Sequence, residues 1–554
     1  MTRTLILSVL CVLASVTLRS QDLQQLREKV AQQEEQIKHL QQAVEEQKTL
    51  LDQALKSSAT ATVSGAPTTV PGRDGTAAAI TNSNPDSAQL VPVANAARPQ
   101  IAPIPRQKVE TRPSPLSISL GNTTLTPLGF VDMTYFTRST NVGSGIGTNF
   151  AGIPFNTSTG YHLDETNFSA QNSRIGFRVD SNFMGAKVLG YLEADFLFSN
   201  DANTFQVTSN SAGLRLRNYF VDVEKNGFEV MGGQDWSFLT PNRKGLSPLP
   251  SDLFYTQNMD TNYQVGLIWT RQPQFRFIMH PTENFAFGVS LENPQQYIGG
   301  ASGASTVTLP ANLNSSLSGQ FQSGNSVTGI PNLFPDIIVK GAYDAHPGDR
   351  TFHVDAAGLI TGFKDYVSVT KPPAVPGSHT AVGYGGSVNS NLELFKGFHL
   401  VENAFASVGG GRYIFAMAPD LIVRPDGSIA PAHSYSTLDG IEAQVAKNTL
   451  LTAYYGGAYV AREVAFDPTA AGSTLLKPVY AGYGYASSTT SFNRYIQEAT
   501  FGWVQTLWKN SNYGALALIN QYSYLWREPW YVSPGAPKQT HTNMVYIDLR
   551  YTLP

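Results

Sequence analysis

Cysteine and charge are both scarce in this chain. Cys11 is the single cysteine among 554 residues, and Asp, Glu, Lys and Arg together make up 14%. Because Cys11 lies in an apolar leader, we expect neither disulfides nor thiolate metal sites in the rest of the protein. The formal net charge of −3 gives no reason to expect nucleic acid as a partner. No group of residues in the sequence predicts a metal site or a cofactor.

Long apolar runs are missing after the leader, and none approaches the roughly 20 residues that a membrane helix needs. The start, MTRTLILSVLCVLASVTLRSQ, has Arg3 followed by an apolar run over residues 5–18. This pattern predicts a secretory signal over residues 1–20. Leu10 precedes Cys11 where lipid attachment requires a small residue, which argues against a lipoprotein. We therefore expect the protein in the periplasm, the outer membrane or the medium.

Catalytic motifs are absent as well. The sequence has no H-E-x-x-H, no G-x-S-x-G and no Walker-type loop. The glycine-rich stretches at 300–305 and 382–387 do not open a helix, so they do not predict a phosphate cradle. We expect no enzyme. A barrel hydrolase that uses Asp and His residues of its loops is the alternative, and a hydrolysis assay on purified protein distinguishes it.

A heptad pattern occupies residues 22–56 and assigns residues 21–56 to a helical coiled coil. Apolar residues alternate at steps of three and four between polar flanks. One heptad position holds Leu23, Val30, Ile37, Val44 and Leu51, and the other holds Leu26, Gln33, Leu40, Gln47 and Ala54. The helix would be about 50 Å long. The pattern predicts self-association, and the residues alone leave the number of chains open.

Residues 57–118 consist mainly of Ala, Thr, Ser, Pro and Gly. Such a stretch cannot bury enough apolar surface to fold, so we expect a flexible, disordered linker.

Residues 119–554 contain recurring aromatic-rich stretches that predict about sixteen antiparallel strands. The links between them alternate between short ones, such as FMGA at 183–186 and EKNG at 224–227, and long ones rich in Gly, Ser, Asn and Pro. An outer-membrane barrel has this arrangement, with short periplasmic turns, long outside loops and an even strand number. The predicted strands are 128–137, 172–183, 186–199, 212–224, 227–237, 262–280, 283–292, 335–345, 349–361, 378–392, 397–412, 435–447, 449–462, 492–509, 512–528 and 541–553.

The strands also alternate between an apolar and a polar face. In SRIGFRVD (173–180), Ile175, Phe177 and Val179 share one face, while Arg174 and Arg178 share the other. Lipid outside a barrel and water inside it explain this pattern around a closed sheet. A soluble β-sandwich and a secreted β-helix are the rival folds. We predict an all-β transmembrane barrel.

The stretches GYLEADFLF (190–198), LRLRNYFVDV (214–223) and GGQDWSF (232–238), with the preceding signal, coiled coil and linker, resemble the DcaP-type porins of Gram-negative outer membranes. The resemblance implies a homotrimeric channel in outer-membrane lipid, with a periplasmic coiled coil, for small anionic solutes such as dicarboxylates. Phosphate-selective porins also carry an N-terminal coiled coil and are the nearest rival family. A structural role, in which the coiled coil braces the envelope against peptidoglycan, is a further alternative.

By the porin analogy, the third long loop, about residues 238–261, folds into the lumen. Rings of charge at such a constriction set selectivity. Our candidates for the pore constriction and solute binding are Arg174, Arg178, Lys187, Arg215, Arg217, Arg276, Asp252 and Asp260. Paired arginines that only brace the wall are the alternative, with Glu193, Asp195 and Glu229 as partners. Asn218 and Asp222 share the outward phase of Leu214, so either a bulge shifts the register or this surface meets a neighbouring subunit.

Overall fold

The computed structural model describes Lys38 and residues 114–198, 210, 212–324, 329–486 and 492–554. The predicted signal, all of the predicted coiled coil except Lys38, and most of the predicted linker lie outside these residues. Within the described part of the chain, no helix is long and apolar enough to cross a membrane.

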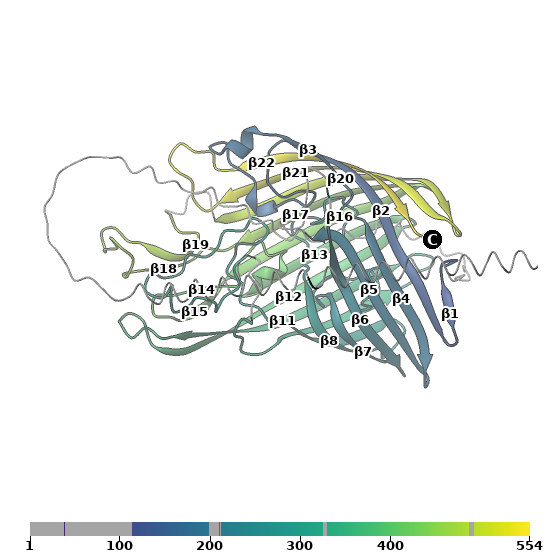
Figure 1. Ribbon diagram of the computed structural model, residues 1–554, viewed down its shortest axis with the longest axis horizontal. Coiled ribbons are helices and arrows are strands. Elements are labelled where there is room, and N and C mark those ends of the chain that lie inside the picture. Colours follow the sequence, from purple (N-terminus) through teal and green to yellow (C-terminus); the bar gives the residue numbers. More distant parts are fainter. Residues whose placement is uncertain (1–37, 39–113, 199–209, 211, 325–328, 487–491) are drawn as a thin grey trace, which may run out of the picture. The chain divides into compact units, whose positions relative to one another are not determined.

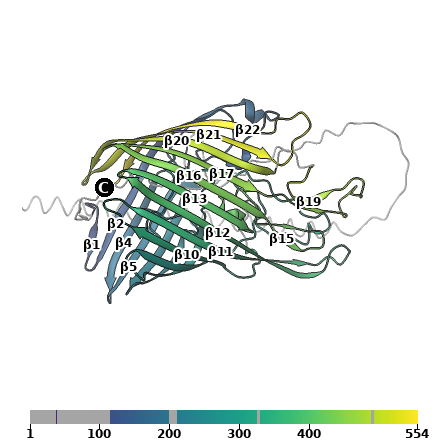
Figure 2. The same cartoon turned by 180° about the vertical axis from the view of Figure 1, so that it is seen from behind.

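An antiparallel sheet of eighteen strands forms the body of the molecule. Two short strands, β1 (Ile118–Leu120) and β3 (Glu165–Ser169), pair with β2 alongside the ring. Each of the remaining sixteen pairs with the next one along the chain, and the last pairs with the first, so the sheet closes into a barrel (Figures 1 and 2). Closure removes the unpaired edges of the sheet.

The sixteen strands of the ring are β2 (Thr123–Arg138), β4 (Arg174–Phe183), β5 (Ala186–Phe198), β6 (Gly213–Lys225), β7 (Phe228–Trp236), β8 (Arg271–Met279), β9 (Phe285–Glu292), β10 (Asp336–Ala345), β11 (Phe352–Val367), β12 (Gly377–Phe395), β13 (Phe398–Val408), β16 (His433–Ala446), β17 (Thr449–Val460), β20 (Asn493–Asn510), β21 (Gly514–Pro529) and β22 (Thr540–Thr552). All sixteen predicted strands are confirmed, with ends that shift by several residues. The prediction for 262–280 is wrong at its start, because residues 262–270 belong to the preceding loop.

The two ends of the barrel differ in their connections. One end has tight turns, in which Met184-Gly185 and Asn226-Gly227 take positive φ angles. Two such residues in succession form the two-residue turn that matches the twist of a hairpin. The other end carries the long connections, including the small sheets β14 (Leu421–Val423) with β15 (Ile429–Pro431) and β18 (Glu463–Phe466) with β19 (Tyr480–Tyr483) (Figure 1). The C-terminus lies at the short-turn end (Figures 1 and 2). Three single-turn 3₁₀ helices also lie in the long connections: η1 (Phe150–Gly152), η2 (Thr159–His162) and η3 (Gly411–Tyr413).

Side chains alternate across the wall as the sequence predicts. Ile175 and Phe177 are 48% and 46% exposed on the outside of the barrel. Arg174 on the same strand has its side chain inside the barrel and is 2% exposed. On β9, Phe285 and Phe287 face outward and Ala286 is buried. The outer surface of the barrel is therefore apolar along these strands, and the inner surface carries the charge.

A bulge in β6 determines which side chains of that strand face the inside of the barrel. The pairing of β5 with β6 shifts register between Glu193 and Ala194, opposite Arg217 and Asn218. Both Arg217 and Asn218 are consequently buried inside, and Asp222 follows them to the inner face. The bulge, rather than contact with a neighbouring subunit, accounts for the polar residues that share the phase of Leu214.

The connection from β7 to β8, residues 237–270, runs through the lumen, and we call it the inner loop. Residues 253–269 of this loop are all buried. The backbone N–H of Asn242 donates to Asp355 Oδ2 on β11 at 3.0 Å, and that of Val265 donates to Glu498 Oε2 on β20 at 3.0 Å. The loop is therefore tied to the wall on several strands, in agreement with the predicted inward fold.

Glycines permit the loop backbone to approach the wall closely. Gly266 has a φ of +90°, and a Cβ on it would lie 1.9 Å from the carbonyl oxygen of Thr437 on β16. A Cβ on Gly456 of β17 would lie 1.8 Å from the carbonyl oxygen of Val265. Any larger residue at either position would displace the loop.

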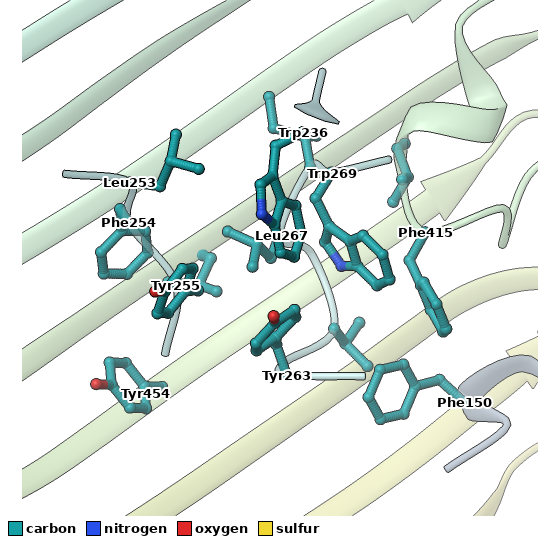
Figure 3. Close-up of a cluster of buried hydrophobic side chains, with 14 of the residues drawn as sticks. Phe150, Trp236, Leu253, Phe254, Tyr255, Tyr263, Leu267, Trp269, Phe415 and Tyr454 are labelled. Carbon is teal, nitrogen blue, oxygen red and sulfur yellow. The ribbon is translucent and has the colours of Figure 1, made fainter. Parts of the chain in front are cut away.

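An aromatic cluster fills the lumen beside the inner loop (Figure 3). The ring of Trp269 lies 5.5 Å from those of Trp236 and Tyr263 and 4.8 Å from that of Phe415 in the connection between β13 and β16. Phe415 in turn contacts Phe150 of η1. Three long connections thus pack against one another inside the barrel. This packing explains why 262–270, although rich in apolar residues, is a buried loop and not a strand.

Candidate functional site

Four arginines and two carboxylates gather on the inner wall near the long-loop end of β4, β5, β6 and β8. We call this group the arginine cluster: Arg174, Arg215, Arg217, Arg271, Glu193 and Asp195. Arg217 lies at its centre, with Nε 2.6 Å from Glu193 Oε1 and Nη1 2.8 Å from Asp195 Oδ2. Arg174 Nη1 reaches the same Glu193 oxygen at 3.1 Å, and Arg215 Nη2 reaches the same Asp195 oxygen at 2.8 Å.

Strand register assembles this cluster. Asp195 on β5 is the direct cross-strand partner of Arg174 on β4 and of Arg215 on β6. The bulge in β6 then turns Arg217 to the inside beside Glu193. Opposite charges on directly opposed residues stabilise a sheet. Glu193 and Asp195, named as candidate partners from the sequence, are therefore both paired with arginines.

The cluster has more donors than acceptors. Arg174 is 2% exposed and Arg217 is fully buried. Within the arginine cluster, four guanidinium nitrogens have no hydrogen-bond partner among the described residues: Arg174 Nε, Arg174 Nη2, Arg217 Nη2 and Arg271 Nη1. A buried donor without a partner is costly. Four cations against two anions also leave a local surplus of positive charge.

The short-turn end of the lumen has the opposite character. A cavity of about 780 Å³ lies there between the wall and the tip of the inner loop. Seven carboxylates line it, against three Lys or Arg side chains and one His. We call this cavity the acidic vestibule. Its charged lining residues are Asp180, Asp222, Glu224, Glu229, Asp252, Glu283, Asp344, Arg178, Lys187, Lys244 and His280.

The predicted constriction residues divide between these two regions and the wall. Arg174, Arg215 and Arg217 belong to the arginine cluster. Arg178 and Lys187 line the acidic vestibule, where they pair with Asp180 at 2.8 Å and Glu224 at 3.1 Å. Arg174 and Arg178 are four residues apart, about 13 Å along the strand, so they lie in different groups.

The remaining predicted residues have separate positions. Asp252, on the inner loop, lines the acidic vestibule together with Arg178. Asp260, farther along the loop, accepts a hydrogen bond from Tyr546 Oη on β22 at 3.0 Å. Arg276 Nη2 lies 3.0 Å from Asp235 Oδ2 on the adjacent strand β7. Asp260 is therefore bound to the wall at β22.

Sequence reasoning missed Arg271 in the arginine cluster and Tyr263 beside it. Both lie in the stretch 262–280, which the sequence predicts as one strand. If Arg276 faces inward on such a strand, the odd-numbered residues Tyr263 and Arg271 are expected to face outward. The acidic vestibule was missed as well. Its signal was the spacing of Asp222, Glu224 and Glu229 around the EKNG turn, where Glu224 and Glu229 are direct cross-strand partners.

Two groups of the acidic vestibule that lie outside the strands have shifted pKa values. Burial raises the pKa of Asp252, although its hydrogen bond with Ser247 and the nearby Lys244 act in the opposite direction. The hydrogen bond between His280 Nε2 and Glu229 Oε2, 2.8 Å long, raises the pKa of His280 above its ordinary value despite partial burial. Glu229 was expected to pair with an arginine, and its observed partner is His280.

Comparison of the fold with solved structures finds the outer membrane channel DcaP of Acinetobacter baumannii, at a TM-score of 0.55 and 18% identity over 78% of this chain and 98% of that one. This chain shares the barrel fold of that channel. An anion-selective porin from Comamonas acidovorans follows at a TM-score of 0.41 and 14% identity, over 78% of this chain and 99% of that one. OmpF of Salmonella typhi aligns at a TM-score of 0.40 and 10% identity, over 78% of this chain and 100% of that one. No family model and no curated protein matches the sequence.

Proposed function

We propose that this protein is a porin of the Gram-negative outer membrane, a channel and not an enzyme, through which small hydrophilic solutes diffuse. The apolar outer face of the closed barrel and the charged inner face support this proposal. Lipid covers the first, and water and solutes occupy the second. The tight turns face the periplasm, together with the N-terminal coiled coil. The comparison with DcaP, an outer membrane channel, supports the same assignment.

The preferred solutes are small anions, and dicarboxylates fit best. The observation that carries this proposal is the surplus of buried guanidinium donors in the arginine cluster. Each guanidinium presents a planar fork that matches two carboxylate oxygens. The local surplus of positive charge in the cluster supports the binding of a solute that carries two negative charges. A solute with two carboxylates uses several forks at once, whereas inorganic phosphate has a single centre.

Single-channel recording in planar bilayers tests this proposal. Succinate should reduce the chloride current of the wild-type channel at concentrations at which phosphate does not. Arg174→Gln should weaken the effect about fivefold, since it removes one charge from contact range of the solute. The matched control is Arg350→Gln, because Arg350 lies in a turn and donates to backbone carbonyls. Equal block by phosphate and succinate would indicate a phosphate-selective channel instead.

We also propose that three chains associate. The heptads at 22–56 support self-association, and the resemblance to trimeric porins supports the number. Cross-linking and mass measurement of the full chain in detergent should give a trimer, and a chain lacking residues 22–56 should dissociate more readily. A retained trimer that binds peptidoglycan in a pull-down but conducts no solute would favour the structural role in the envelope.

A further inference from the structure

The acidic vestibule has features that the proposed anion preference does not use. Asp222 on β6 and Glu229 on β7 are 8% and 7% exposed, and both line the cavity. Asp222 Oδ1 and Glu229 Oε1 have no hydrogen-bond donor within the described part of the chain. Buried carboxylate oxygens without donors are costly, so the site is incomplete as the protein alone supplies it.

The surrounding charges do not neutralise these carboxylates. Glu224 and Glu229 are direct cross-strand partners on the inner face, a placement that destabilises a sheet when both are charged. Lys187 contacts Glu224 at 3.1 Å, but its side chain is 73% exposed, so this ion pair is weak. His280 contacts only the Oε2 atom of Glu229. Arg276 on β8 also acts on Asp222, but its ion pair is with Asp235. Apart from Arg276, the three carboxylates share one exposed lysine and one histidine.

The shape of the cavity indicates the kind of cation. The described residues contain no group of three or more His, Cys, Asp or Glu side chains close enough to enclose a metal ion. Apolar side chains line the cavity together with the carboxylates, among them Leu189, Leu246 and Leu249. The inner loop and β10 contribute Asp252 and Asp344 to the lining. An ammonium group is a compact charge with several N–H donors, and an alkyl chain packs against leucines.

We propose that the acidic vestibule is a binding site for small linear diamines. One ammonium group donates to Asp222 Oδ1 and Glu229 Oε1, the methylene chain lies along the leucines, and the second ammonium group lies near Asp252. The binding of a diamine depends only on the cavity and its carboxylates. The effect of a bound diamine on the current rests on the proposed channel function. A bound diamine would narrow the periplasmic mouth of the channel.

Calorimetry on the purified full-length protein in detergent tests the site without any need for conduction. We expect 1,5-diaminopentane to bind at least about tenfold more tightly than 1-aminopentane, because the second charge-assisted hydrogen bond is lost with the monoamine. It should also bind more tightly than its bis(trimethylammonium) analogue, which has the same charge and no N–H donor. Equal affinity for the three compounds, or tighter binding of Mg²⁺, would overturn the proposal.

The double variant Asp222→Asn, Glu229→Gln should weaken 1,5-diaminopentane binding by about tenfold or more. Asp349→Asn, which removes a carboxylate from the turn between β10 and β11, should leave binding unchanged. Unaltered binding in the double variant would overturn the assignment of the site. If the double variant does not fold, the series of three compounds on the wild type remains decisive. Failure of the channel proposal would appear separately, as absence of conductance with diamine binding intact.

Discussion

The two charged regions of the lumen compensate their charges in different ways. At the long-loop end, three arginines form short ion pairs with Glu193 and Asp195, and the central guanidinium is fully buried. At the short-turn end, seven carboxylates face three basic side chains across an open cavity. The first region has buried donors without a partner, and the second has buried acceptors without one. The two ends of the lumen therefore differ in the sign of their surplus charge.

The largest effect is expected from breaking the ion pairs of the arginine cluster. Asp195→Ala removes the carboxylate shared by Arg215 and Arg217 and leaves buried cations without a partner. Breaking a buried pair in this way costs about 3–5 kcal/mol. Urea unfolding of the barrel in detergent should show this loss of unfolding free energy. Glu224→Ala in the acidic vestibule should cost far less, because its partner Lys187 is exposed, and an equal loss in both variants would contradict the contrast.

The inner loop that separates the two regions can be displaced from the wall. Gly456→Leu places a side chain where the carbonyl of Val265 now lies, and overpacking of this kind costs about 1–3 kcal/mol. The barrel should remain folded, and single-channel conductance should rise because the loop moves out of contact with β17. Gly457→Leu is the matched control, since a Cβ there meets only ordinary contacts. Unchanged conductance in Gly456→Leu would mean that the loop does not limit the current.

The smallest effect concerns pH in the acidic vestibule. His280 has a pKa raised by its hydrogen bond to Glu229, and its positive charge lies near Asp222, Glu224 and Glu229. Its ion pair therefore contributes stability that is complete below the unfolded pKa and is lost as pH rises through the raised pKa. Over the same rise, diamine binding should strengthen by about threefold at most, as expected for a partly exposed charge.

Calorimetry at a series of pH values would measure this step in the wild type. His280→Gln should show diamine binding without the step. A wild-type profile that stays flat across the raised pKa would place His280 outside the influence of the diamine site.

The sequence predicted the wall far better than the lumen. Strand alternation depends on local residue type, so Ile175, Phe177 and Arg174 could be placed on the correct faces. The inner loop could not be followed in the same way, because residues 253–269 are buried by partners from distant strands. Arg271 and Tyr263 were missed for this reason. For β6, the sequence allowed two interpretations, a bulge or contact with a neighbouring subunit. Pairing between Glu193 and Arg217 depends on that bulge.

The most direct test of the account is the reversal potential of the channel under a tenfold KCl gradient, measured for the wild type and two variants. We expect the wild-type reversal potential to lie between zero and the equilibrium potential of chloride. Arg174→Gln combined with Arg217→Gln should move it toward the potassium value, because the anion site loses its surplus charge. Asp222→Asn combined with Glu229→Gln should move it slightly in the opposite direction. A shift of both variants in the same direction, or none in the arginine variant, would contradict the division of the lumen into a basic and an acidic region.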